Sequence, residues 1–333
     1  GNNGANNVNN GNNGNNGNNG NNGNNGEPDA GDDARDADAP DDVGNDVRED
    51  TPPDDVGDDT ADAEPDGGAP CEPQRTPAEF ELEEISVNGS RVLIARPEGR
   101  PAGLMFVIHG TGGDARVFFD RVEAALFTHD ALDRGLTIIS PESINRGGQN
   151  GRGSKWEEDP TPDNPDILNI LATVDRMHER GVPEDTPIYL AGGSNGGNFV
   201  ASIAQQLEVV SAYIFISRAK AYRTEQDPVV PPTFFVEGVN DTTLPEAGPD
   251  LPLPYENYVY LRDRGFTVEH RYNPVAPVTP GRFTRIPGIS CPQSIAVYRA
   301  LGAHPGVLDE GDMLVEGWET TGWEDAMPPM AQP

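Results

Sequence analysis

The chain has 333 residues, of which 23 are lysine or arginine and 56 are aspartate or glutamate, so its formal net charge is −33. This acidity argues against nucleic acid or an anionic membrane surface as a partner, because both attract basic proteins. No segment approaches the roughly 18 consecutive apolar residues that a membrane-spanning helix requires. We therefore expect neither a nucleic-acid partner nor a membrane-spanning segment.

The first 72 residues have the composition of a disordered tether. Residues 1–26 repeat a Gly-Asn-Asn triplet, and residues 27–72 contain 19 acidic side chains but only two arginines, Arg35 and Arg48. The first part offers nothing to bury, and charge repulsion favours an extended second part. Since no aspartate run has the spacing of a calcium-binding EF-hand loop, we expect a solvated spacer and no metal site.

This tether resembles, in composition alone, the spacers that follow the lipidated cysteine of bacterial surface lipoproteins. The chain begins at Gly1 rather than at methionine, which suggests that a preceding segment has been removed. The resemblance implies a lipid anchor at the N-terminus and an extracellular or cell-surface location.

From residue 73 onward, the apolar pattern predicts strands that alternate with helices. Residues 80–87 and 91–95 alternate apolar and polar side chains around Asn88-Gly89, which favours an antiparallel hairpin. The uninterrupted apolar run 104–108 is too short for a helix and is typical of a buried parallel strand. Further strands are expected at 136–140, 188–191, 212–217, 233–237 and 266–273, and helices at 117–127, 163–180, 196–207 and 255–264.

This alternation predicts an α/β fold with a mainly parallel sheet covered by helices on both faces. We assign residues 73–281 to this domain and residues 282–333 to a C-terminal helical appendage and tail, packed on the same domain, with its best helix at 295–301. A disulfide between Cys71 and Cys291 would tie the end of the tether to this appendage, and two unpaired thiols are the alternative.

The strongest motif is a G-x-S-x-G pattern at residues 192–196, between a predicted strand and a predicted helix. Its glycines leave the space that a sharp strand-to-helix turn requires, so the hydroxyl of Ser194 is presented at the edge of the sheet. The dipole of the following helix favours negative charge that develops there. The pattern predicts the nucleophile of an acyl transfer, and an ordinary glycine-rich connection is the alternative.

Acyl transfer also needs two N–H donors that point at the developing oxyanion. Asn195, directly after the serine, supplies one of them. The sequence HGTGG at 109–113 follows the strand 104–108, and we assign the second donor to Thr111. A simple tight turn is the other interpretation of these glycines.

Taken together, these motifs resemble the α/β-hydrolase superfamily over residues 90–273. Within it, the chain resembles the secreted poly(3-hydroxybutyrate) depolymerases and feruloyl esterases, which are cofactor-free serine esterases. The residues that carry this resemblance are His109-Gly110 after the Pro97-Glu98-Gly99 lead-in, Ser140-Pro141-Glu142 at the end of the next strand, Trp156 in the following loop, residues 163–166 at the start of a helix, and the GGSNGG turn.

A serine nucleophile needs a base that an acid orients, and in this fold the order along the chain is serine, acid, histidine. Asp241 stands where the family has its acid, although it also suits a turn. The family's histidine belongs after the last strand, but residues 274–290 contain none. Of the two histidines that follow Asp241, we choose His270 over His304 as the nearer to the sheet edge, while a structural role for His270 and a surface role for His304 stay open.

We therefore expect an extracellular serine esterase that acts without a cofactor on a polyester, a feruloyl or acetyl ester, or a similar acyl substrate. Trp156 is expected to form an aromatic wall for the acyl or polymer chain, with a packing role as the alternative. The missing histidine keeps a second function open, which is a surface-displayed binding protein with a catalytically degenerate hydrolase fold.

Overall fold

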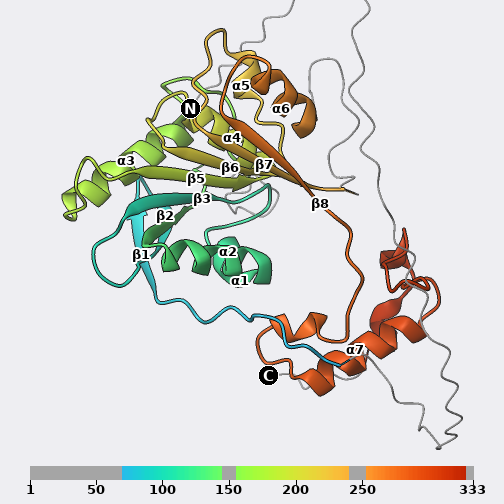
Figure 1. Cartoon of the computed structure of the whole chain (residues 1–333). Coiled ribbons are helices and arrows are strands. Elements are labelled where there is room, and N and C mark those ends of the chain that lie inside the picture. The colour runs from blue at the N-terminus through green and yellow to red at the C-terminus, as the bar shows by residue number, and fades with distance from the viewer. Residues whose placement is uncertain (1–69, 145–154, 240–252, 328–333) are drawn as a thin grey trace, which may run out of the picture. The chain divides into compact units, whose positions relative to one another are not determined.

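The computed structural model describes residues 70–144, 155–239 and 253–327, which form an eight-stranded sheet with helices (Figure 1). The strand order is β1-β2-β4-β3-β5-β6-β7-β8. β2 pairs antiparallel with both β1 and β4, and all other neighbours are parallel. The strands are β1 (Leu82–Val87), β2 (Ser90–Ala95), β3 (Gly103–Ile108), β4 (Leu136–Pro141), β5 (Ile188–Gly193), β6 (Ser211–Phe215), β7 (Thr233–Gly238) and β8 (Val268–Asn273).

The predicted leading hairpin is confirmed. Asn88 and Gly89 connect β1 to β2 with φ of 51° and 79°. Positive φ at both central residues gives a two-residue turn whose twist matches that of the strands, and Asn-Gly adopts it at low cost.

Helices cover both faces of the sheet, as predicted. Phe106 of β3 belongs to the core under α3, α4 and α6, whereas its neighbour Val107 belongs to the core under α1 and α2 (Figure 1). This alternation is why β3 reads as a continuous apolar run. The helices are α1 (Val117–Asp120), α2 (Val122–Asp133), α3 (Pro165–Glu179), α4 (Asn195–Ile203), α5 (Ala221–Thr224), α6 (Pro254–Arg262) and α7 (Cys291–Ala303).

The C-terminal residues form a small apolar cluster of their own around Val297 and Leu301 of α7. The predicted disulfide between Cys71 and Cys291 is confirmed, and it joins the first described residues to the start of α7. Nearby, the backbone N–H of Gln74 donates to the hydroxyl of Thr284 at 2.8 Å. The tether predicted at 1–72 lies outside the described residues up to residue 69, and none of the described helices is long and apolar enough to cross a membrane.

Candidate active site

The sharp turn predicted at Ser194 is confirmed. Ser194 lies between β5 and α4 with φ of 54° and ψ of −124°, and its side chain is exposed. A Cβ at Gly192 would lie 2.5 Å from the carbonyl oxygen of Gly196, and a Cβ at Gly196 would lie 2.3 Å from that of Ile108. Both glycines are therefore required, and the strain at Ser194 is held by close backbone packing.

The loop after β3 lies against this turn. A Cβ on Gly110 would lie 3.3 Å from the Cβ of Ser194, so the next residue, Thr111, is close to the serine as well. Among the described residues, the backbone N–H groups of Thr111 and Asn195 donate no hydrogen bond. Their role as oxyanion donors stays a prediction. It is supported by the closeness of this loop to Ser194 and by the two N–H groups that have no partner in the described structure.

The side chain of Asn195 fastens a second loop to the turn, a contact that sequence reasoning missed. Its Oδ1 accepts from the backbone N–H of Trp156 at 2.7 Å, and its Nδ2 donates to the Glu158 carboxylate at 2.5 Å. The sequence motif indicates a role only for the backbone N–H of this residue. Its buried carboxamide now explains why loop 155–160 stays against α4.

Trp156 is not the open aromatic wall that was expected. Its side chain is 1% exposed, its indole N–H donates to the carbonyl of His109 at 2.8 Å, and its ring stacks on Phe199. A buried ring with a satisfied N–H packs and positions. The packing role, which was the alternative, therefore fits Trp156. Through its bond to His109, it fixes the start of the loop that contains Thr111.

Two titratable groups lie behind the turn. Burial lowers the pKa of His109, so this imidazole stays neutral and donates from Nδ1 to the carbonyl of Gly110 at 2.8 Å. Burial also raises the pKa of Asp166, although its carboxylate accepts from the backbone N–H groups of Ile144 and Glu157. Both groups hold loops in place and neither one contacts Ser194 in the described structure.

An apolar residue flanks Ser194 on the β6 side. The backbone N–H of Ser194 donates to the carbonyl of Phe215 at 2.9 Å, and Ile216 follows with φ of 49° and 38% of its surface exposed. A β-branched residue with positive φ is strained, and such strain collects at functional sites. No sequence signal marks Ile216, because isoleucine normally avoids this conformation.

The structure does not bring His270 to Ser194. β8 is separated from β5 by β6 and β7, which places His270 roughly 14 Å from Ser194 at the usual strand spacing. Its Nε2 lies 2.6 Å from Glu237, and the rings of Tyr255, Tyr258 and Tyr272 surround it. These contacts fit the structural role that the sequence left open for His270, rather than the role of a catalytic base.

The described part of the structure shows no contact of Ser194 with the other two candidate triad residues, Asp241 and His304. Asp241 lies outside the described residues. His304 directs Nδ1 at the carbonyl of Pro305, at the end of α7. All five histidines of the chain fall within the described ranges, and none of the contacts found for them involves Ser194.

Comparison with known proteins finds solved structures that are similar to this chain at low sequence identity. No protein-family model and no curated protein matches the chain. Similar solved structures include an α/β serine hydrolase homologue from Coxiella burnetii (16% identity, covering 59% of this chain and 88% of that chain, TM-score 0.42), an esterase/lipase from an uncultured bacterium (12%, 64% and 83%, 0.40) and the acylaminoacyl peptidase of Pyrococcus horikoshii (14%, 59% and 37%, 0.44).

The narrower resemblance to depolymerases and feruloyl esterases stays a hypothesis from the sequence. The architecture itself is clear from the strand order, the helices on both faces and the strained serine between β5 and α4. The strand order and the turn between β5 and α4 are those of the α/β-hydrolase fold.

Proposed function

We propose that the protein is a serine esterase that hydrolyses carboxylic esters through an acyl-enzyme on Ser194. The observation that carries the proposal is the exposed residue Ser194 on a strained turn, close to two backbone N–H groups without partners in the described structure. Donors fixed in advance stabilise the oxyanion of the tetrahedral intermediate without reorganisation. Maintaining this strained arrangement costs free energy that an inert connection would not require.

In this proposal, the oxygen of Ser194 attacks the acyl carbonyl, and the alcohol leaves with a proton. Water then releases the acid and restores the serine. The amides of Thr111 and Asn195 bind the oxyanion in both steps. Because no histidine contacts Ser194, both steps proceed without an imidazole base, and the oxyanion donors supply most of the acceleration.

The substrate is an ester with a small apolar acyl group, or a polyester chain end, which the exposed side chain of Ile216 contacts beside the serine. The Cys71–Cys291 disulfide supports the extracellular or cell-surface location, because disulfides persist in oxidising compartments. Feruloyl and acetyl esters are the other members of the substrate class that we propose.

The proposal is tested by following acylation rather than turnover. 4-Nitrophenyl acetate should give a stoichiometric burst of nitrophenolate followed by slow turnover, because an activated leaving group makes deacylation limiting. A phosphonate probe should add its mass to the peptide that contains Ser194. Both signals should vanish in Ser194→Ala and persist in Ser211→Ala, which removes a half-exposed hydroxyl at the opposite end of the strands.

A second function, a binding protein with a degenerate hydrolase fold, is favoured by one observation, which is that His270 is buried against Glu237 instead of serving Ser194. It predicts that the phosphonate leaves the wild-type protein unmodified at concentrations that label a serine esterase fully. Equal background hydrolysis by wild type and Ser194→Ala would support this second function over the first.

A further inference from the structure

Strand β8 forms one edge of the sheet, and no described strand pairs with its outer side. The backbone N–H of Thr233 donates to the carbonyl of Thr267, and that of Val239 donates to the carbonyl of Asn273. Backbone polar groups alternate in direction along a strand, so those of residues 268, 270 and 272 face away from β7. Such a row of groups is a template for another strand.

We propose that two copies of this chain pair through β8, antiparallel, with His270 of each copy at the two-fold axis. The eight-stranded sheets then join into one continuous sheet. The outward groups of residues 268, 270 and 272 meet the same groups of the partner, and each such pair exchanges two hydrogen bonds. A self-complementary edge of this kind gives a closed two-fold dimer.

The side chains of β8 complement one another in this register. Val268 lies opposite the partner's Tyr272, a β-branched residue against an aromatic ring that is 46% exposed in the single chain. Glu269 lies opposite the partner's Arg271, and both are exposed. These cross-strand pairs each stabilise a sheet, and the two-fold axis forms every one of them twice.

The charges on β8 also exclude the neighbouring registers. An axis one residue earlier would place Glu269 opposite the partner's Glu269, and an axis one residue later would place Arg271 opposite the partner's Arg271. Like charges directly opposite destabilise a sheet. The central imidazoles do not conflict in the proposed register, because His270 of each copy is bonded to its own Glu237.

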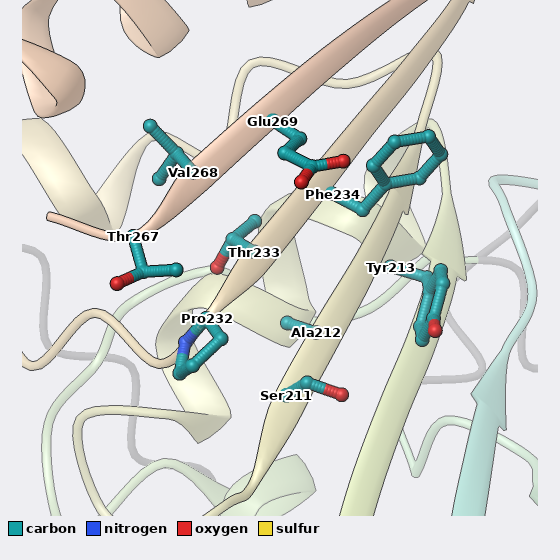
Figure 2. A pocket seen from close by; sticks show the side chains of 9 residues that line it. All are labelled: Ser211, Ala212, Tyr213, Pro232, Thr233, Phe234, Thr267, Val268 and Glu269. Atoms are coloured by element: carbon teal, nitrogen blue, oxygen red, sulfur yellow. The ribbon is translucent and has the colours of Figure 1, made fainter.

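The face that carries Glu269 leaves room for this contact. Figure 2 shows the side chains of Glu269 and Phe234 beside one another on this part of the sheet. A hollow of about 370 Å³ lies at the amino-terminal ends of β6, β7 and β8. α6 packs on β7 and β8 from the opposite face, where Leu261 and Phe235 are buried. The hollow lies at the opposite ends of the strands from Ser194, and the β8 edge is separated from β5 by β6 and β7, so this dimer does not depend on the proposed esterase.

Charge exchange tests the register on the full chain. Light scattering coupled to size-exclusion chromatography at about 0.15 M salt, where long-range repulsion is screened, should show a dimer for the wild type. Glu269→Arg or Arg271→Glu alone should raise the dissociation constant at least about tenfold, because each makes two like-charge pairs. The double exchange Glu269→Arg/Arg271→Glu should restore the dimer.

Cross-linking provides a second measurement that needs no change in affinity. Residues in non-hydrogen-bonded pairs lie about 4.5 Å apart between Cα atoms, which suits a disulfide. Glu269→Cys mixed with Arg271→Cys should therefore oxidise to a covalent dimer faster than either variant alone. Thermal unfolding of each variant confirms that this exposed strand still folds.

A wild type that stays monomeric at all concentrations would overturn the proposal. A dimer that withstands both single charge reversals, or cross-linking of either single cysteine variant as fast as the mixture, would place the interface elsewhere and overturn it as well.

Discussion

The turn at Ser194 and the site at His270 differ in every property that a catalytic pair should share. Ser194 is exposed, strained and without a titratable partner in the described structure. His270 is 5% exposed in its side chain, lies in a regular strand and is bonded to Glu237. The comparison teaches that the strained turn at Ser194 forms without an imidazole beside it in the described part of the chain.

The largest expected effect concerns the backbone packing that strains Ser194. Gly196→Ala should destabilise the protein by about 3 kcal/mol, because the new Cβ would lie 2.3 and 2.4 Å from the carbonyl oxygens of Ile108 and His109. Urea unfolding measures this loss. Gly302→Ala in α7 is the matched control, since its Cβ meets nothing within 4 Å and should be neutral or slightly stabilising. Equal effects at both positions would remove the packing explanation.

The next prediction tests whether the two regions are independent. His270→Asn should cost about 1–3 kcal/mol of stability, because the buried carboxylate of Glu237 loses one of its hydrogen-bond donors. The rate of Ser194 labelling by a phosphonate should stay within about twofold of the wild-type rate, since a base must reach to within about 3 Å of the hydroxyl. A labelling rate reduced a hundredfold in a folded variant would make His270 the base after all.

The local structure at Ser194 could be predicted from the sequence. The surroundings of His270 could not, because they depend on residues that are distant in the sequence. The sharp turn at Ser194 follows from its own glycines, and the hairpin follows from Asn88-Gly89, so neighbouring residues suffice to predict both. The partner of His270 depends on the register of β7 against β8, which places Glu237 on the same face of the sheet. The position of His270 in the sequence, near the sheet edge that was expected to hold Asp241, does not determine that register.

The contacts of Trp156 and Asn195 could not be predicted from the sequence either, because both side chains are buried by residues distant in the sequence. A tryptophan in a polar loop suggests an exposed binding surface, and only the packed structure shows it stacked on Phe199. The carboxamide of Asn195 has no sequence signal beyond its place after the nucleophile. Its contact with loop 155–160 arises from residues 39 positions apart.

The buried histidine His109, in the loop behind Ser194, should make the stability of the protein depend on pH. The pKa of His109 is lowered by burial from the ordinary value of 6.5, so the folded state resists protonation. Its contribution to stability is complete above pH 6.5 and is lost as the pH falls below that value, by up to about 1.4 kcal/mol per pH unit. His109→Asn, which keeps a donor for the carbonyl of Gly110, should show a shallower loss of unfolding free energy between pH 7.5 and 5.5. Parallel pH profiles of the two proteins would contradict this assignment.

The smallest expected effect concerns Ile216, whose strained backbone, with φ of 49°, lies beside Ser194. Ile216→Asn should stabilise the protein by roughly 0.5–1 kcal/mol, because asparagine tolerates positive φ and this relief of strain exceeds the apolar burial lost at a residue that is 38% exposed. Val210→Asn, at another exposed apolar residue and without positive φ, should show no such gain. If Ile216 also contacts the acyl group, the same variant should lose the preference for longer over shorter acyl phosphonates while it gains stability. A stability gain without that loss would make the strain a property of the fold alone, and no gain at all would mean that the loop after β6 relaxes around isoleucine.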